Sequence, residues 1–223
     1  MQTENEIIKL FNQQLSNDER RLMDGLNSPA QVQAFLNETS YPGGEENRSA
    51  LEVLRQRQAH CLDGGLFAAA ALRRIGYPAQ IVDLLPEAGL DDDHVLALFQ
   101  VEGYWGAVAK SNYSGLRFRE AIHRSLRELV LSYFDDFFNL DGVKTLRAYT
   151  RVIRLNRFDH LNWMTTSTGV DAIEQSLKKF KLIPLISPTQ AAQLAPVDNR
   201  SFEAGILGIN RAGAYIPRAT DAK

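Results

Sequence analysis

The chain of 223 residues contains a single cysteine, Cys61. One cysteine cannot form a disulfide within the chain, so nothing in the sequence implies an oxidising compartment. An excess of charge of either sign is also lacking, because 25 lysines and arginines oppose 27 aspartates and glutamates. The resulting formal net charge of -2 argues against general nucleic-acid binding, which depends on neutralising many phosphates.

Long apolar runs are missing as well. No segment reaches the roughly 20 residues that a membrane-spanning helix needs. The polar start "MQTENEIIKLFNQQLSNDERR" lacks the basic end and the apolar block of a signal peptide. Zinc-ligand spacing, a dinucleotide fingerprint and a phosphate-loop lysine are absent too. We therefore expect a cytoplasmic protein with no cofactor, no bound metal and no membrane partner, and the sequence does not indicate its oligomeric state.

With 44% hydrophobic residues, the chain is rich enough in apolar side chains to form one folded domain over residues 1–223. Helix-like spacing over 3–15, a capped helix after Ser28 and Pro29, and "RSALEVLRQRQ" precede a mostly buried helix that starts near Cys61. A strand "AQIVDLL" and a hairpin of "HVLALFQ" and "YWGAVAK" follow it. This order predicts an α+β fold and not alternating βαβ units.

The chain divides by these patterns into N-terminal helices over 1–45, a core over 46–115 and a helical extension over 116–223 with a possible added strand. In that extension, we expect a helix over 121–138 that buries the aromatic residues of "SYFDDFF". The segment "KTLRAYTRVIRL" is consistent with a strand, and "TSTGVDAIEQSLKKFK" with a capped helix. The ending "AGAYIPRATDAK" is expected to extend from the domain.

Cys61 stands at the start of the most apolar helical run, beside Gly64 and Gly65. Unpaired N–H groups and the dipole at a helix N-terminus favour an anion, so such a thiol ionises below its ordinary range. On this basis we expect Cys61 to be alkylated readily at about pH 6. The position of Cys61 alone is equally consistent with a structural role, in which the cysteine is a small buried apolar residue and not a nucleophile.

Histidine is the usual base for a cysteine nucleophile. His60 adjoins Cys61 but points in another direction on a helix, His123 lies in a charged segment and His160 in a loop. His94 instead opens a strand directly after an acidic loop. A helix and the sheet packed on it bring such positions together, so Cys61 and His94 are the candidate pair.

The segments "HCLDGGLFAAAALRRIGYPAQIVDL" and "DHVLALFQVEGYWGAVAKSN" together resemble the core of the transglutaminase-like superfamily, within the papain-like cysteine hydrolases. The resemblance covers roughly residues 45–115. It implies a papain/transglutaminase-like core in which a helix bearing the nucleophile packs on an antiparallel sheet. It assigns Cys61 as nucleophile and His94 as its base, and Trp105 matches the tryptophan on the hairpin partner strand.

The third catalytic residue departs from the family pattern. Family members usually carry an aspartate shortly after the hairpin tryptophan, and the matching position in this chain is Ala109. A two-residue turn at Glu102 and Gly103 would put Ser111 opposite His94, and one extra residue would put Asn112 there. We choose Asn112, whose amide oxygen accepts an imidazole N–H. The alternative is that Asn112 has only a structural role, as a turn residue that ends the strand.

An oxyanion site is expected from the Cys61 N–H and an upstream glutamine, Gln58 or Gln56, although a solvated helix face is the simpler reading of both. Arg117 and Arg119 are candidates for binding an anionic group at the mouth of the cleft; pairing with the nearby acidic residues is the alternative. The loop "GLDDDH" is expected to be solvated and not to bind a metal ion.

These residues predict a cysteine-dependent hydrolase or acyltransferase acting on a peptide or small amide. Hydrolysis is favoured over transfer because water always competes for the acyl group. The alternative is an inactive transglutaminase-like domain that uses the cleft for binding.

Overall fold

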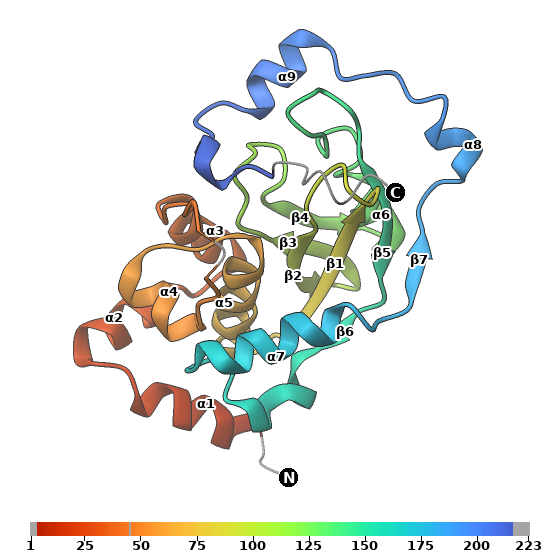
Figure 1. Ribbon diagram of the computed structural model, residues 1–223. Helices are drawn as coiled ribbons and strands as arrows, with labels where there is room; N and C mark the ends of the chain where they lie inside the picture. Colours follow the sequence, from red (N-terminus) through yellow and green to blue (C-terminus); the bar gives the residue numbers. More distant parts are fainter. Residues whose placement is uncertain (1–3, 45, 216–223) are drawn as a thin grey trace.

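A computed structural model describes residues 4–44 and 46–215 and combines helices with an antiparallel sheet. The sheet has seven strands in the order β4-β3-β2-β1-β5-β7, with β6 also paired to β1. Five N-terminal helices form a lobe on one side of it, and the blue C-terminal segment arches over the upper end of the strands (Figure 1). In the described part of the chain, no helix is long and apolar enough to cross a membrane.

Three of the five N-terminal helices begin after a serine cap. Ser28 accepts the Gln31 N–H, and Ser16 and Ser49 form capping boxes with glutamates three residues later. The helix after Ser16 was not expected from the sequence. The bounds are α1 Glu4–Gln13, α2 Asn17–Gly25, α3 Pro29–Asn37, α4 Ala50–Gln56 and α5 Cys61–Arg74.

The central strands are β1 Gln80–Pro86, β2 His94–Val101 and β3 Tyr104–Val108. Glu102 and Gly103, with φ of 51° and 85°, form the two-residue turn between β2 and β3. Two positive φ values in succession match the right-handed twist of the flanking strands. Val101 therefore pairs with Tyr104, and the predicted hairpin is confirmed.

The predicted helix over 121–138 is wrong. Residues Arg119–His123 form β4, which pairs with β3, and only Leu126–Leu131 form a helix, α6. The aromatic residues after α6 are buried, as expected, but by turns and not by a helix, because β3 offered an open edge that β4 covers.

Residues after position 115 supply the remaining strands of the sheet. Thr166 caps α7 as predicted, and "KTLRAYTRVIRL" forms two strands. The bounds are β5 Leu146–Thr150, β6 Ile153–Arg154, η1 Leu155–Leu161, α7 Ser167–Leu177, β7 Leu182–Pro184, α8 Pro188–Ala191, α9 Asn199–Gly205 and η2 Arg211–Gly213. With β4, this segment adds four strands to the sheet, so it is not a helical extension. Residues 216–223 of the expected C-terminal extension lie outside the described residues.

The two faces of the sheet bury separate cores. Val95, Ala97 and Phe99 of β2 point towards α5, whereas Leu96 and Leu98 point to the other face. Helix α5 approaches very closely, because a Cβ atom at Gly64 would lie 2.1 Å from the Lys110 Cβ and one at Gly65 would lie 2.8 Å from a Val95 methyl group. The glycines after Cys61 thus set the depth at which this helix lies against the sheet.

Candidate functional site

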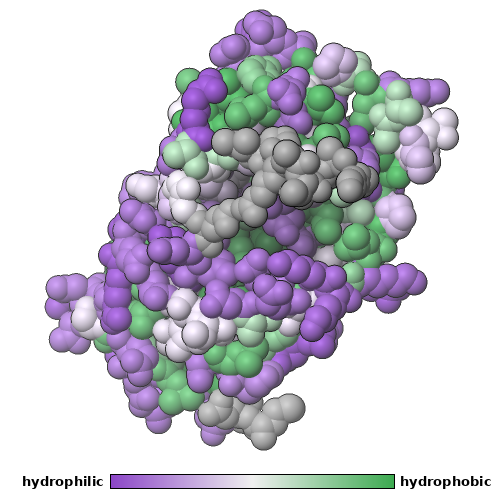
Figure 2. All heavy atoms as spheres, viewed as in Figure 1, coloured by the Kyte–Doolittle hydropathy of each residue, from purple (hydrophilic) through white to green (hydrophobic). Residues whose placement is uncertain are grey.

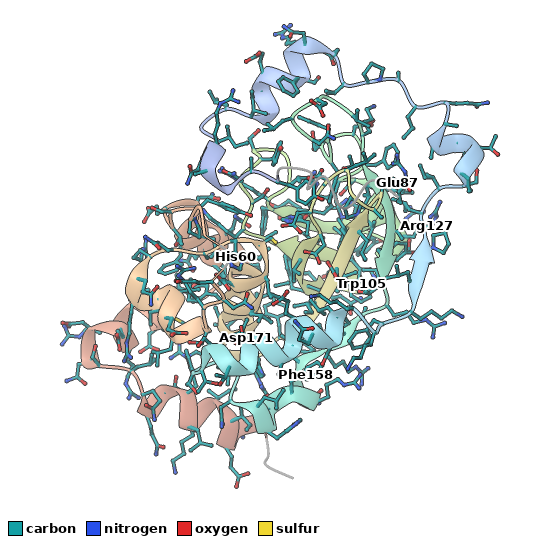
Figure 3. The ribbon with its side chains drawn as sticks, in the orientation of Figure 1. His60, Glu87, Trp105, Arg127, Phe158 and Asp171 are labelled. Atoms are coloured by element: carbon teal, nitrogen blue, oxygen red, sulfur yellow. The ribbon has the colours of Figure 1, made fainter. Side chains whose placement is uncertain are left out.

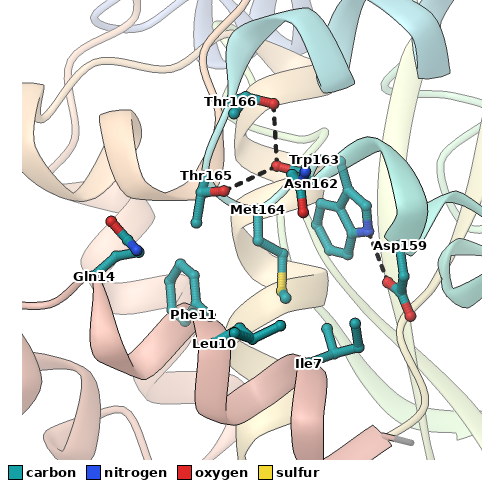
Figure 4. Close-up of a pocket in the computed structure, with 10 residues that line it drawn as sticks. All are labelled: Ile7, Leu10, Phe11, Gln14, Asp159, Asn162, Trp163, Met164, Thr165 and Thr166. Carbon is teal, nitrogen blue, oxygen red and sulfur yellow. Dashed lines mark hydrogen bonds between the residues drawn. The ribbon is translucent and has the colours of Figure 1, made fainter. Parts of the chain in front are cut away.

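Two cavities differ in the chemistry of their linings. The larger one, about 350 Å³, lies between α1 and residues 159–166 and is lined mainly by apolar and amide side chains (Figure 4). Its carboxylate, Asp159, is already bonded to Arg73 and to the Trp163 indole. The smaller cavity, about 50 Å³, is lined by both Cys61 and His94. It is therefore the candidate active site.

Cys61 is the first residue of α5, as predicted, and is buried. Its thiol donates a hydrogen bond to the Asp93 carbonyl oxygen at 3.6 Å. Burial raises the pKa of the Cys61 thiol well above its ordinary value, and the nearby carboxylates of Asp93, Asp92 and Asp83 raise it further. The Val95 N–H opposes this shift. The depressed pKa expected from a helix N-terminus is not found, because the thiol is screened from water and surrounded by acidic residues.

His94 is held by one main-chain oxygen. Its Nε2 lies 2.8 Å from the Leu116 carbonyl oxygen, which can only accept, so Nε2 carries the proton and Nδ1 keeps its lone pair. The rings of Tyr133 and Phe137 pack against it at 6.4 and 6.3 Å. Burial lowers the pKa of His94 to about 4, and the bond to Leu116 opposes the shift. Nδ1 has no hydrogen-bond partner among the residues described.

The expected hydrogen bond between Cys61 and His94 is not formed. Side chains alternate along a strand, so Val95 faces α5 and His94 points to the opposite face. Cys61 reaches the edge of β2 from the helical side and bonds to the backbone there. The two side chains border one cavity, although they approach it from opposite faces of β2.

Asn112 and Ser111 do not contact His94. Asn112 donates to the Asn210 carbonyl oxygen at 2.9 Å and accepts the Asn210 N–H at 2.8 Å. The Ser111 hydroxyl accepts the Tyr113 N–H at 3.0 Å. Both residues line the cavity, but the Leu116 carbonyl takes the orienting place that the sequence assigned to Asn112. The hairpin register was right, and the loop beyond β3 turns these side chains elsewhere.

The expected oxyanion and support residues lie away from the cavity. Gln58 and Gln56 both accept hydrogen bonds from Arg48. Trp105 pairs with Gln100, near the end of β2 opposite His94, and its carbonyl bonds to His123. None of the three side chains borders the cavity.

Tyr41 is the site residue that the sequence did not indicate. It lines the cavity, and the Cys61 N–H faces its hydroxyl oxygen. Burial raises the pKa of Tyr41 well above its ordinary value, so the hydroxyl is a neutral donor. No motif singles out the tyrosine of "SYPGG", because it reaches α5 from a loop 20 positions earlier in the chain.

The remaining candidates are engaged in structure. Arg119 pairs with Asp136 at 3.0 Å and lies over the Tyr133 ring. It therefore pairs with a nearby acidic residue, which was the alternative to binding an anionic group. The Arg117 side chain does not border the cavity. His60 directs Nε2 to the Glu46 carbonyl at 3.1 Å and to Asp63 at 3.4 Å, away from the thiol.

The acidic loop borders the cavity without forming a metal site. Desolvation and the neighbouring Asp92 raise the pKa of Asp93 to about 7, and burial raises the pKa of Asp91 to about 6. Asp91 accepts a hydrogen bond from Thr145. Within residues 4–44 and 46–215, no group of three or more His, Cys, Asp or Glu side chains could hold a metal ion.

Comparison with known proteins finds similarities among solved structures, and two of them are described here. No family model and no curated protein matches the chain. Legionella pneumophila LapG in an EGTA-treated form aligns at a TM-score of 0.33 and 18% identity, covering 48% of this chain and 70% of that one. A second structure of Legionella pneumophila LapG aligns at a TM-score of 0.33 and 17% identity. It covers 55% of this chain and 91% of that one.

The C-terminal segment covers the candidate site. Gly213 and Tyr215 line the cavity, and a Cβ atom at Gly213 would lie 2.4 Å from the Pro42 carbonyl oxygen. The Asn210 side chain donates to the Tyr41 carbonyl at 2.9 Å. A 50 Å³ space holds about one or two water molecules, so a peptide enters only after this segment moves.

Replacing Asn112 by alanine should therefore speed the alkylation of Cys61. The substitution removes both hydrogen bonds to Asn210, and at about 1 kcal/mol each they correspond to roughly a thirtyfold change in exposure of the thiol. The labelling rate with iodoacetamide, followed by mass spectrometry, measures this. Wild type should react slowly at pH 7 and faster as the pH rises, because its thiol pKa is raised. Asn156→Ala, at an exposed asparagine of η1, is the control. Equal rates in all three proteins would show that Asn210 does not close the site.

Proposed function

We propose that this protein is a cysteine-dependent hydrolase of amide bonds, a peptidase or amidase, with Cys61 as nucleophile and His94 as base. The proposal rests on one observation: the thiol at the start of α5 and the imidazole with a free Nδ1 line the same cavity. The motifs around these two residues, which resemble the transglutaminase-like superfamily, support the same assignment.

In the first step, the Cys61 thiol turns from the Asp93 carbonyl and transfers its proton to His94 Nδ1 as sulfur attacks the amide carbonyl carbon. The C–N bond then breaks, the amine leaves with the proton from His94, and the acyl group stays on sulfur as a thioester. Water attacks the thioester, His94 again accepts a proton, and the carboxylic acid is released with the thiol restored. The Leu116 carbonyl keeps the imidazole in the tautomer that both steps need.

In this proposal, the Tyr41 hydroxyl, whose oxygen accepts the Cys61 N–H, donates its own proton to the negative oxygen of the tetrahedral intermediate. The two groups face each other at the start of α5, where His60 provides no side-chain cap. An uncapped helix N-terminus keeps its N–H groups available to an anion. Removal of one such donor typically costs about 10²–10³ in rate.

A second function, a binding domain without catalysis, is favoured by the electrostatics. The pKa of Cys61 is raised and that of His94 is lowered to about 4, so thiol and imidazole are both neutral at pH 7. A neutral pair can transfer a proton as substrate binds, whereas a binding domain needs no proton transfer.

Trapping of the acyl-enzyme separates the two functions. The full chain is incubated with a panel of activated esters and peptide amides, quenched in acid and weighed by mass spectrometry. A hydrolase gains the acyl mass on Cys61, loses it with time and releases acid in repeated turnovers, and Cys61→Ala gains nothing. Binding of peptides without any adduct or turnover, in wild type and in the faster-reacting Asn112→Ala, would reject the hydrolase.

A further inference from the structure

A third groove, larger than both cavities described above, lies at the other end of the sheet. Its volume is about 640 Å³, and it is lined by residues of β1, β2, β3, β5, β6 and β7 and by the start of α6. Trp105 and Gln100 are cross-strand partners, as are Gln80 and Arg154, so aromatic, amide and basic side chains form one row on this face. His94 and Gln100 are six residues apart on β2, which places the groove about 20 Å from the candidate site.

Three arginines give the groove its charge. Arg127, Arg151 and Arg154 line it and are exposed, and no acidic residue lines it. Within the described residues none of the three has a salt bridge or a side-chain hydrogen bond. Neighbouring arginines differ, since Arg119 and Arg147 are each paired with a carboxylate. Unpaired guanidinium groups that converge on one groove favour an anion, and their planar donors match phosphate oxygens.

Two aromatic rings border the same groove. Trp105 is half-buried and, in the part of the chain that is described, makes no ring–ring or cation–π contact. Tyr149 is buried on β5, which two strands separate from the Trp105 strand β3. The side chains of Gln80 and Gln100 have no hydrogen-bond partner among the described residues, so their amides are available to a ligand. A planar ring with polar edges can stack on Trp105 and meet these amides.

We propose that this groove binds a nucleotide, with the base on Trp105 and the phosphates on the three arginines. The volume is within the range of small-molecule sites, about 300–1,000 Å³. An acidic peptide would satisfy the arginines but leave the aromatic ring and the two amides without partners. In Figure 3, Trp105 and Arg127 lie on the sheet side of the molecule, and His60, which adjoins Cys61, lies in the helical lobe. The groove therefore lies apart from the candidate active site.

The test uses tryptophan fluorescence of the full chain. The other tryptophan, Trp163, is buried on the α5 face but lines the cavity beside α1, so a fluorescence change is assigned to Trp105 only if it disappears in Trp105→Leu. The probes are ATP, adenosine, inorganic tripolyphosphate and a polyglutamate peptide. We expect ATP to quench the signal in a saturable way and to bind more tightly than adenosine or tripolyphosphate. Added salt should weaken the binding.

Arg151→Gln and Arg154→Gln should each weaken ATP binding about tenfold, the effect of losing a charge-assisted hydrogen bond. Arg200→Gln, at an exposed arginine of α9, is the matched control and should leave the affinity unchanged, as should Cys61→Ala. Calorimetry of Trp105→Leu should show weaker ATP binding with tripolyphosphate binding retained. The proposal is overturned if ATP does not bind at millimolar concentration, or if tripolyphosphate binds as tightly as ATP. It also fails if only the peptide binds, or if Arg200→Gln loses as much affinity as the groove variants.

Discussion

Cys61→Ser is expected to abolish turnover of any amide that the protein hydrolyses, and His94→Gln to lower kcat by about 10²–10⁴-fold. Serine has a far higher pKa than a thiol, and one imidazole of low basicity cannot activate it. Glutamine keeps the volume and a donor to the Leu116 carbonyl but has no nitrogen lone pair to accept the thiol proton. Steady-state kinetics on the substrate found by acyl trapping measures both losses.

His123→Gln is the matched control for His94. His123 is also buried and bonded to a main-chain oxygen, that of Trp105 at 3.1 Å, but lies on β4 away from the cavity. Its substitution should leave kcat within about twofold of wild type. An equal loss in both variants would mean that the histidines support the fold and that His94 is not the base.

The pH profile follows from the buried imidazole. Burial lowers the pKa of His94 to about 4, so the ring stays an unprotonated base down to that pH. Activity should therefore persist at pH 5, where an ordinary histidine with a pKa of about 6.5 is mostly protonated. The same shift means that folding stability falls as the pH drops from 6.5 through 4, because the unfolded chain binds the proton more readily. In His94→Gln, this part of the acid destabilisation should disappear.

The helices and strands around Cys61 could be predicted because local signals determine them. Serine caps, a proline at N1, alternating apolar residues and a Glu-Gly turn each act within a few residues, and α3, α5 and the β2–β3 hairpin follow from them. Residues Arg119–His123 were misassigned to a helix because pairing with the open edge of β3 outweighs their local pattern. Such pairing depends on a partner in three dimensions, which one sequence does not display.

In the site, Cys61 and His94 line one cavity, but the predicted hydrogen bond between them is not formed and the partners of His94 were not predicted. The orienting atom of His94 is the Leu116 carbonyl, and every residue carries such an oxygen, so no residue type marks it. Asn112 was assigned from strand register, but it clamps Asn210, almost a hundred residues later. The thiol pKa was misjudged for a related reason. The helix N-terminus is visible in the sequence, but burial and the approach of Asp83 from another strand are not.

The largest expected loss of stability comes from a buried ion pair far from the site. Arg73 of α5 is 1% exposed and makes two hydrogen bonds to Asp159, at 2.7 and 2.8 Å. Asp159 also accepts the Trp163 indole N–H at 3.1 Å. The pair ties α5 to η1. Figure 2 shows hydrophilic side chains over much of the helical lobe. Asp159→Ala leaves a buried guanidinium without its carboxylate, which typically costs about 3–5 kcal/mol.

The next residue of α5 supplies the control. Arg74 pairs with Asp24 at 2.8 Å, but the Asp24 side chain is 61% exposed, so Asp24→Ala should cost less than about 1 kcal/mol. Urea unfolding followed by circular dichroism gives both free energies. The double variant Arg73→Met with Asp159→Leu should regain part of the stability lost in Asp159→Ala, because it buries no unpaired charge. Equal losses for Asp159→Ala and Asp24→Ala would show that water reaches Arg73. Both variants break an arginine–aspartate pair, and the Arg73 pair costs more to break only if water is excluded from it.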